Sequence, residues 1–520
     1  MVSRASRPLT LLWFRDDLRV TDHEALTAAR DDGDVVAIWI REERDTEGRG
    51  PRPLGAATRW WVHESLQVLG AELDKRGIPL LFAAGTATQI IPEVAAELGA
   101  DTVRWSRRYA PASRALDEAV ARELEARGIA SEDSPGALLV EPWKVEPSSA
   151  SAYYKVFTPF WNAARQVSVD LPLPAVKAQS LPQEVADRVD RVRGANTHLL
   201  AEVDDLGLLE AGTGPASTRF SLRSGEGAGA AKISLGEGDP RFPWWEDTIA
   251  RHWTPGCVAA HEAVDHLGER IAGYAEDRDI PGDPEGTSAL SPRLRFGEIS
   301  ARKLLAAVDA LGDVGAVDRE AWIRQLYWRE FAWHLTYHVP DLDRRPMRPE
   351  FAGFPYEDDP EALAAWQAGR TGIALVDAGM RQLWRTGWMH NRVRMVAASL
   401  LTKNLLLPWQ LGEQWFWDTL VDADEANNPV SWQWVAGCGA DASPFFRVFN
   451  PERQRARFDP DGVYVRQWLE GDTGESAREV DAGDSDDGSA GEQVPIVDLG
   501  ESRQAALAAF DAMKSAQSAD

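Results

Sequence analysis

The first 140 residues alternate short apolar runs with longer amphipathic stretches, and this alternation constrains the fold more than any other feature. Short apolar runs are typical of buried strands, whereas apolar residues at helical spacing indicate helices. We expect strands at residues 9–14, 35–40, 79–82, 102–105 and 137–140, and helices at residues 56–76 and 111–127. Strands that alternate with helices form a parallel sheet covered by helices on both faces. The sequence therefore predicts an α/β domain over residues 7–142.

The rest of the chain predicts a long connection followed by a helical region. Residues 143–245 carry patches of Pro, Gly and Ser, and we interpret them as a linker with short helices. The run Gly225-Glu226-Gly227-Ala228-Gly229 follows no strand and misses the dinucleotide-binding spacing, so it predicts a flexible segment. Helical patterns fill residues 246–469, with segments at 257–276, 298–310, 318–338, 372–387, 391–405 and 411–420. Residues 471–493 are acidic and almost without apolar side chains, which predicts disorder, and residues 495–514 predict one last helix.

Charge and cysteine content narrow the class of protein. The 520-residue chain has a net charge of −26, which argues against nucleic acid as a partner. However, residues 470–520 hold 13 acidic and 3 basic side chains and contribute −10 by themselves, so a basic groove elsewhere is compatible with the total. Cys257 and Cys438 have neither metal-ligand spacing nor a disulfide framework. With no signal peptide and no run of 18 apolar residues, we expect a cytoplasmic protein without membrane contact.

Two segments close together in sequence, Gly387–Met395 and Asp422–Trp434, interleave tryptophan, arginine, carboxylate and amide side chains. A plain core consists of aliphatic residues, because buried charge is costly unless it is paired. The chain also has 22 Trp against 8 Tyr, and an indole N–H needs a partner when it is buried. An excess of Trp favours stacking surfaces or electron-transfer stations, with ordinary packing as the alternative. We interpret the two segments as a pocket for a large, flat molecule with polar edges.

Groups suited to phosphate and charge accompany this pocket in the sequence. Thr287, Ser288 and Ser291 supply three hydroxyls just before a helical stretch, an arrangement that favours phosphate, although a simple helix cap has the same pattern. Asp422 and Asp424 are separated by one residue, and no third ligand stands nearby, so we expect no metal. Arg394 is available to pair with one of these carboxylates and to hold the polar edge of a ring.

Five motifs resemble the photolyase/cryptochrome family, and most closely the class I bacterial cyclobutane pyrimidine dimer photolyases. They are W-F-R-D-D-L-R-V-T-D (13–22), E-G-T-S-A-L-S (285–291), W-R-E-F (328–331), W-M-H-N-R-V-R-M (388–395) and D-A-D…N-x-x-x-W-Q-W (422–434). The resemblance covers about residues 8–469 and 495–514. It implies an α/β parallel-sheet N-terminal domain, a linker and an all-α C-terminal domain that binds FAD. It also implies a monomer whose partner is ultraviolet-damaged DNA.

The resemblance implies which residues contact the flavin. Asn428 is expected to face flavin N5, where the family's side chain tunes the reduced and radical forms. Plant cryptochromes have Asp at this position, so Asn favours a repair enzyme. The implied FAD contacts are Tyr274, Thr287, Ser288, Leu290, Ser291, Trp322, Arg329, Asn391, Arg394, Asp422, Asp424 and Asn428.

For DNA, the resemblance implies an aromatic wedge and a set of basic contacts. Trp328 and Trp434 are expected to stack on a flipped dimer, whose extrusion costs less than that of a normal base. The implied dimer contacts are Gln325, Arg392 and Met395, and the implied phosphate contacts are Arg278, Arg392 and Arg447. A weaker candidate set, for which a solvated basic face is the alternative, is Arg453, Arg455 and Arg457.

The implied activity is repair of cyclobutane pyrimidine dimers under blue light, in which reduced FAD lends the dimer an electron and regains it after the ring opens. Gln325 departs from the Glu of the bacterial dimer photolyases and matches (6-4) photolyases and animal cryptochromes. Asn391 stands where (6-4) enzymes have the second residue of a His-His pair, and it favours the dimer as substrate. The alternatives are a (6-4) photolyase and a cryptochrome-type flavin photoreceptor.

Photoreduction and light harvesting add further expectations from the family. The electron route is expected to run through Trp432 and Trp409 to Tyr356, where the family has a third Trp. An oxidised tyrosine must lose a proton, so we expect photoactivation to be altered or to use another Trp. The family also binds a second, antenna chromophore. Tyr109 is followed by Ala110 rather than by the acidic residue of folate-binding members, which favours 8-hydroxy-deazaflavin over folate.

Overall fold

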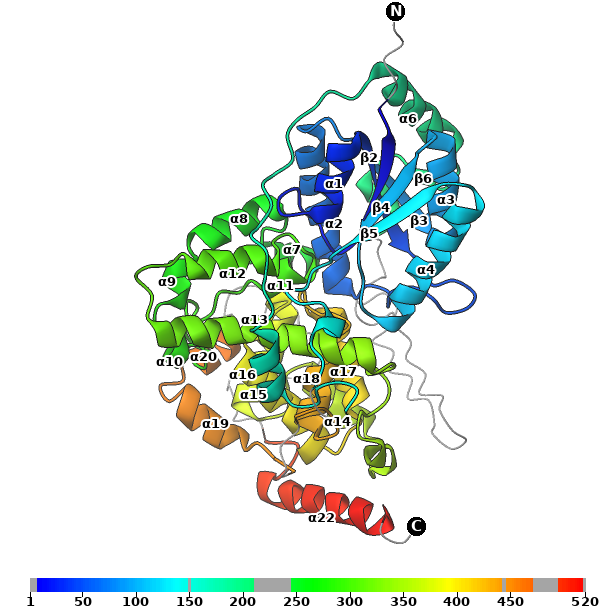
Figure 1. Cartoon of the computed structure of the whole chain (residues 1–520). Coiled ribbons are helices and arrows are strands. Elements are labelled where there is room, and N and C mark those ends of the chain that lie inside the picture. Colours follow the sequence, from blue (N-terminus) through cyan, green and yellow to red (C-terminus); the bar gives the residue numbers. More distant parts are fainter. Residues whose placement is uncertain (1–6, 148–150, 210–244, 442–445, 471–493, 518–520) are drawn as a thin grey trace, which may run out of the picture.

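The computed structural model describes residues 7–147, 151–209, 245–441, 446–470 and 494–517, without the side chains of residues 245–247 and 517. A sheet region and a helical region lie against each other, with the C-terminal helix at the far end of the helical region (Figure 1). The Gly-rich run at 225–229 and the acidic segment at 471–493 lie outside the described residues. Among the described helices, none has the length and apolar character needed to cross a bilayer.

A six-stranded sheet forms the N-terminal region, with strand order β5-β4-β1-β2-β3-β6. The strands are β1 Leu9–Phe14, β2 Asp34–Glu42, β3 Leu80–Gly85, β4 Thr102–Ser106, β5 Ala130–Ser134 and β6 Leu199–Leu200. Pairing is parallel from β5 across to β3, and the two-residue β6 runs antiparallel to β3. The predicted parallel α/β sheet is confirmed.

Helices cover both faces of the sheet (Figure 1). Successive side chains of a central strand point to opposite faces, so an apolar strand such as β1 needs packing partners on both. Leu12 and Phe14 of β1 enter one buried cluster with α1 and α2. Leu11 and Trp13 enter the opposite cluster with α3, α4 and α6. These helices are α1 Glu24–Asp32, α2 Ala56–Asp74, α3 Ala87–Leu98, α4 Pro111–Ala126 and α6 Gln183–Ala195. Burial on both faces explains why β1 is an unbroken apolar run in the sequence.

The strand predicted at residues 137–140 is wrong. The sheet ends instead at β5, whose sequence Ala-Ser-Glu-Asp-Ser is polar because most of this edge strand is solvent-accessible. Residues 137–140 form a loop, in which the backbone N–H groups of Leu139 and Val140 donate to Glu330 Oε2 at 2.8 and 3.1 Å. The loop is apolar because Leu139 and Val140 pack with residues of α13 (Ala316–His338). Burial against a helix, rather than strand structure, produced the pattern.

The chain after the sheet region is mainly helical. The connection carries η1 Pro142–Lys144, α5 Phe157–Ala164 and η2 Val203–Leu206 in addition to α6 and β6. The helical region contains α7 Trp245–Ala250, α8 Cys257–Asp265, α9 Leu267–Ile271, α10 Tyr274–Asp277, α11 Ser291–Arg295, α12 Ala301–Asp309, α13 Ala316–His338, η4 Pro349–Gly353, α14 Pro360–Gln367, α15 Ala374–Thr386, α16 Asn391–Ser399, η5 Leu400–Asn404, α17 Trp409–Thr419, α18 Asn427–Ala436, α19 Pro451–Phe458, α20 Val463–Leu469 and α22 Leu499–Gln517. The helix predicted at 257–276 is three short helices, and Gly273 at φ 81° separates the last two.

The C-terminal helix α22 belongs to the packing of the helical region. Met513 and Phe510 join the buried cluster that α15, α16, α17 and α18 share. The side chain of Asn404 donates to Ser502 Oγ at 2.8 Å and ties α22 to the π-helical turn η5. The helices that pack around this cluster include those that carry the motifs 388–395 and 422–434.

Candidate functional site

Two predicted site residues, Ser291 and Arg394, come from separate segments and bind the carboxylate of a third, Asp422. Asp422, between α17 and α18, accepts two hydrogen bonds from the guanidinium of Arg394 at 3.0 and 2.9 Å. Its Oδ2 also accepts a hydrogen bond from the Ser291 hydroxyl at 2.7 Å. Arg394 Nε donates to the Met389 carbonyl oxygen at 2.6 Å, which fixes the guanidinium from its other side. The predicted pairing of Arg394 with one of two carboxylates is confirmed, and its partner is Asp422.

Helix ends explain why these groups meet. Gly387, at φ 66°, ends α15, and His390 starts α16 by accepting the Arg392 backbone N–H on Nδ1 at 3.2 Å. Burial lowers the pKa of His390 to about 4, so its ring is neutral near pH 7 and can accept this hydrogen bond. The cap places Asn391 and Arg394 in the first turn of α16, with the Asn391 side chain exposed. The short sequence W-M-H-N-R-V-R therefore contains the cap and the first turn of α16.

Asp424 has a different role from Asp422 in the structure. Its carboxylate accepts the backbone N–H of Ala426 at 2.8 Å and that of Asn427, and it also accepts the Asn427 side-chain amide at 2.6 Å. A carboxylate in this position accepts hydrogen bonds from free N–H groups at the start of α18. Its negative charge also interacts favourably with the positive end of the helix dipole. Asp424 thus positions Asn428 in the first turn of α18. Its contact with a flavin stays a prediction.

The hydroxyl-rich loop before α11 lies against the buried face of α13. The indole Nε1 of Trp322 donates to Ser288 Oγ at 3.3 Å, and Tyr274, Leu290 and Trp322 share one apolar cluster. Because α11 is a single short turn, its dipole adds little, and phosphate binding here stays a prediction that rests on the hydroxyl groups. Hydroxyls, a paired guanidinium and buried aromatic rings form a donor set that fits a ligand with phosphates and flat rings, as FAD has.

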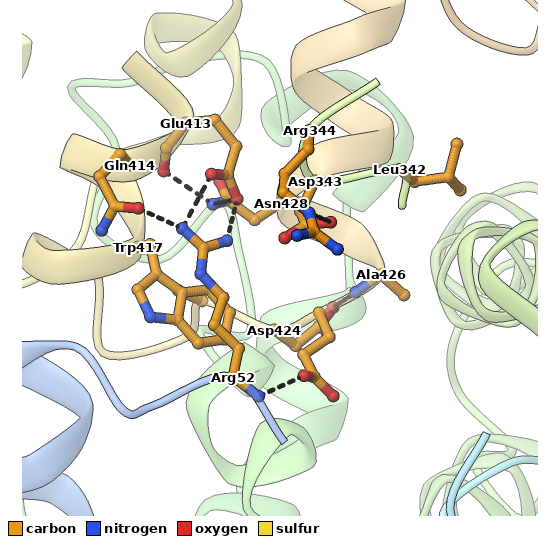
Figure 2. Close-up of polar contacts among 12 residues, drawn as sticks. Arg52, Leu342, Asp343, Arg344, Glu413, Gln414, Trp417, Asp424, Ala426 and Asn428 are labelled. Carbon is orange, nitrogen blue, oxygen red and sulfur yellow. Dashed lines mark hydrogen bonds and ion pairs between the residues drawn. The ribbon is translucent and has the colours of Figure 1, made fainter. Parts of the chain in front are cut away.

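Asn428 lies at the centre of a second polar network (Figure 2). Its side-chain amide donates to the Glu413 carbonyl oxygen at 3.0 Å and to Glu413 Oε1 at 2.8 Å. The carboxylate of Glu413 also binds the guanidinium of Arg52 at 2.7 and 3.0 Å. Asn428, Glu413 and Arg52 come from α18, α17 and the loop between β2 and α2. The motifs identified Asn428 alone, although a buried Glu within the apolar sequence of α17 is itself a signal of a paired charge.

Arg329 shares a pocket with Asp424, another of the predicted flavin contacts. Its Nη1 donates to the Ala137 carbonyl oxygen at 3.0 Å and pairs with Glu330 at 3.1 Å. It lines a pocket at the junction of the two regions, whose other basic groups are Arg15, Arg107, Arg108 and Arg295. The pocket also has Tyr109, Ala110 and Trp333 in its wall, and Asp424 and Glu425 at its border with the site. A direct flavin contact by Arg329 remains a prediction.

The two predicted wedge residues lie on helices that touch each other, α13 and α18. Trp328 is half-buried and stacks on Phe157 of α5, with ring centroids 3.6 Å apart and an angle of 8° between the planes. One face of the Trp328 indole is therefore already covered. Trp434 is half-buried, and its Nε1 donates to the Asp441 carbonyl oxygen at 3.1 Å. Gln325, one turn before Trp328, is half-buried and donates to the Ala321 carbonyl oxygen at 2.9 Å.

Two of the predicted basic contacts meet at Asp279. Arg392 binds Asp279 at 2.5 Å, and Arg278 lies 3.9 Å from the same carboxylate. Met395 follows Arg392 on α16, and its sulfur is 3.9 Å from the Asn391 side-chain nitrogen. Arg447 is exposed elsewhere on the helical region. The weaker set Arg453, Arg455 and Arg457 lies on α19, where Arg455 pairs with Glu452 at 3.3 Å.

The predicted electron route has one buried pair and one half-buried end. Trp432 and Trp409 are buried, and Tyr356 is half-buried and packs on Phe354 with ring centroids 4.7 Å apart. Burial raises the pKa of Tyr356 above its usual range, which opposes loss of the phenol proton to water. The indole of Trp366 packs edge-on against Trp432, with the ring centroids 6.1 Å apart. Sequence reasoning did not single out Trp366.

Comparison with known proteins gives two family matches that cover most of the chain. Residues 10–179 match the DNA photolyase family, and residues 322–512 match the FAD binding domain of DNA photolyase. The chain is 38% identical over 517 residues to a deoxyribodipyrimidine photo-lyase of Agrobacterium fabrum, which covers 97% of this chain and 98% of that protein. It is 31% identical over 473 residues to cryptochrome-2 of Arabidopsis thaliana, which covers 88% of this chain and 70% of that protein.

A solved structure also matches at full length. It is a bacterial class III photolyase from Agrobacterium tumefaciens, with a TM-score of 0.81 and 36% sequence identity over 99% of both chains. The fold expected from the motifs is therefore confirmed over the sheet region and the helical region together.

Proposed function

The chain belongs to the photolyase/cryptochrome family, and on this premise we propose that it repairs cyclobutane pyrimidine dimers in DNA under blue light. The observation that carries the proposal is the convergence of Ser291, Arg394 and Asp422, the last two within the part of the chain that matches the FAD-binding domain. Reduced FAD, when bound, supplies one electron to the dimer and takes it back after the ring opens. The protein's own groups have to hold the flavin, hold the dimer and exclude water.

The polar groups divide these tasks between them. In this proposal Thr287 and Ser288 bind phosphate, and the Asp422–Arg394 pair serves as a fixed donor and acceptor for the edge of the flavin ring. Such fixed dipoles need no reorganisation during electron transfer, which lowers the barrier for moving charge. Trp328 and Trp434 offer aromatic rings on which the flipped dimer stacks, and Arg278 and Arg392 supply positive charge beside it.

The class of repair enzyme is the finer part of the proposal. The motifs resemble class I enzymes, whereas the full-length match to a class III structure favours class III. Asn428 supports a repair enzyme over a photoreceptor, Asn391 supports the dimer as substrate, and Gln325 supports a (6-4) product. The similarity to a plant cryptochrome keeps a flavin photoreceptor as the second candidate function.

Repair of two oligonucleotides, one with a thymine cyclobutane dimer and one with a (6-4) product, separates these functions. Purified protein with reduced flavin is assayed under blue light and in darkness. We expect light-dependent repair of the dimer alone. Repair of the (6-4) product alone would show that Gln325 decides the substrate, and repair of neither with flavin bound and reduced would favour the photoreceptor.

Replacing Trp328 with Ala is expected to weaken binding of dimer-containing DNA by about 1–3 kcal/mol, because a stacked base contributes about that much to affinity. The measurement is a titration with lesion DNA in darkness, with undamaged DNA of the same sequence alongside. Trp143→Ala is the matched control, since Trp143 in η1 is 39% exposed and its ring packs on Tyr337 rather than on a wedge residue. Equal affinities of Trp328→Ala and parent protein for lesion DNA would remove Trp328 from the wedge.

For the second chromophore we propose the pocket lined by Arg15, Arg108, Tyr109 and Trp333, with 8-hydroxy-deazaflavin as its occupant. Arg15 and Arg108 lie 4.4 and 5.2 Å from the Trp13 ring, and Asp117 and Glu42 fix Arg108, so the wall is rigid and rich in aromatic and basic groups. Extraction of the native protein and spectroscopy of the released chromophore test this assignment. A folate spectrum would contradict it.

We further propose residues 7–142 as the antenna-binding domain, 143–245 as the linker and 246–469 as the FAD-binding catalytic domain, followed by the acidic segment and the terminal helix. We also propose a cytoplasmic monomer, in keeping with a DNA substrate. Light scattering of the purified protein, alone and with lesion DNA, tests the monomer.

A further inference from the structure

A short loop of the sheet region is anchored in the helical region. This loop, residues 51–55 between β2 and α2, passes beside α17. The Arg52 backbone N–H donates to Glu425 Oε1 at 2.7 Å, and the Trp417 indole donates to the Pro53 carbonyl oxygen at 2.9 Å. A Cβ on Gly55 would lie 2.0 Å from the Trp417 carbonyl oxygen, so the backbones meet as closely as glycine permits. The loop therefore holds the Arg52 side chain in a fixed place.

Arg52 forms a buried bidentate ion pair with Glu413 (Figure 2). The two guanidinium nitrogens bind Oε1 and Oε2 at 2.7 and 3.0 Å, and Nη2 also donates to Gln414 Oε1 at 2.7 Å. The guanidinium carbon lies 4.1 Å from the Trp417 ring centroid. The side chains of Arg52 and Glu413 are 12% and 2% exposed, so water contributes little to the solvation of either charge. The pair fixes both the position and the charge of the Glu413 carboxylate.

The largest other charges that act on this pair are acidic, and one of them, Asp343, lies 3.6 Å from the Arg344 guanidinium. The pKa of Glu413 is raised overall, because burial, helped by the nearby Asp343, outweighs Arg52 and the Asn428 amide, which lower it. Asp418 and Asp343 also act on Arg52. Arg52 is thus the cation that allows Glu413 to stay ionised among acidic neighbours, because an uncompensated buried carboxylate takes up a proton.

Glu413 in turn holds the Asn428 amide. The Asn428 nitrogen faces two acceptors, the Glu413 carbonyl oxygen and Oε1, at 3.0 and 2.8 Å. An ionised carboxylate has no proton to donate, so the amide nitrogen, and not the amide oxygen, must face it. The nitrogen and oxygen lie on opposite sides of the amide carbon, and fixing one fixes the other. The amide oxygen is therefore the group that Asn428 offers to a ligand.

We infer that Arg52 is a positioning residue for the flavin site, acting from the sheet region through Glu413 to fix the orientation of the Asn428 amide. The inference deepens the proposed function, since it takes the flavin as the ligand that Asn428 faces. Arg52 and Glu413 together have no net charge, so the pair orients Asn428 without placing an uncompensated negative charge beside the flavin.

Three variants separate this role from simple anchoring of the loop. Arg52→Met removes the cation and keeps the bulk of the side chain. The double variant R52M/E413Q removes both charges, and its glutamine oxygen can still accept the Asn428 amide. Arg52→Lys keeps a cation without the bidentate fork and serves if Arg52→Met folds poorly. Gln414→Leu is the control, because it removes another Arg52 partner and leaves the ion pair intact.

The first readout needs no flavin. Infrared difference spectra of the flavin-free protein between pH 5 and pH 9 report a protonated carboxyl group by its carbonyl band. In Arg52→Met we expect a titrating band with a pKa about 1–3 units above that of the parent, because loss of an adjacent cation shifts a carboxyl pKa by about this much. R52M/E413Q lacks the carboxyl and must lose the extra band, which assigns it to Glu413. No new band in Arg52→Met would overturn the inference.

The second readout is the reduction potential of the bound flavin as a function of pH. Above the raised pKa of Glu413, Arg52→Met carries an extra negative charge near Asn428, which opposes addition of an electron and lowers the potential below that of the parent. Below that pKa the two curves should converge, and R52M/E413Q and Gln414→Leu should follow the parent throughout. An equal deviation in Arg52→Met and R52M/E413Q would assign Arg52 to loop anchoring and overturn the inference. Failure of all variants and the parent to bind flavin would instead refute the proposed function, while the infrared result would still decide the Arg52–Glu413 step.

Discussion

Arg394→Met is expected to lose bound flavin and to lower the free energy of unfolding by about 3 kcal/mol. The variant leaves Asp422, whose side chain is 5% exposed, without its cation. Removing one partner of a buried ion pair costs about 3–5 kcal/mol, and the lower end applies because the Arg394 side chain is 23% exposed. A loss of this size is a large fraction of the total stability of a typical domain. Chemical denaturation and the flavin content of the purified protein measure the two effects.

A second substitution distinguishes flavin binding from folding. In R394M/D422N neither charge remains, and the amide oxygen introduced at position 422 can still accept the Ser291 hydroxyl, so most of the lost stability should return. The flavin should not return, because the fixed donor and acceptor for the ring edge are both changed. Arg122→Met, on the exposed side of α4, is the control for loss of an arginine. Flavin retained at the parent level in R394M/D422N would show that this pair is structural only.

Central strands and the main helices could be predicted from the sequence because their environment is uniform. β1 is buried on both faces, so every residue from Leu9 to Phe14 is apolar or buried and the run is continuous. The edge strand β5 has no such constraint, and its polar residues carry no strand signal. The loop at 137–140 shows the opposite error, since Leu139 and Val140 are apolar for contacts with α13. A periodic pattern reports burial, and it reports secondary structure only where the burial is regular.

The site could be predicted where its residues lie within short motifs. Arg394 lies in the first turn of α16 and Asp422 in the loop before α18. The geometry of both places depends on residues nearby in the sequence, so a short motif identifies them. Arg52 and Glu413 are 361 residues apart, and neither has a local pattern that names the other. Long-range pairs of this kind follow from the docking of the loop on α17, which needs the fold first. Arg329 shows the same limit, because its partner Ala137 is 192 residues away in the sequence.

Lys403 gives the second large expected effect, a stability that depends on pH through one buried amine. The Lys403 side chain is in the π-helical turn η5 and is 1% exposed. It donates to the Ala436 carbonyl oxygen, and its nitrogen lies 3.5 Å from the Phe446 ring centroid. Burial lowers its pKa from 10.5 to about 7. Burial raises the pKa of the Cys438 thiol to about 12, so the thiol stays neutral up to pH 10.

The sign follows from proton binding. Between pH 7 and 10.5 the unfolded chain keeps a proton on Lys403 that the folded protein has lost, so the stability contributed by this site rises with pH. Lys403→Met removes the titration, and we expect the stability difference, variant minus parent, to fall by about 3 kcal/mol from pH 7 to pH 10. Denaturation of both proteins across this range measures the difference, and Lys75→Met, at an exposed surface pair with Glu72, should stay parallel to the parent. Parallel curves for Lys403→Met as well would mean that the ammonium stays charged when buried, stabilised by the carbonyl groups at the end of α18 and by the Phe446 ring.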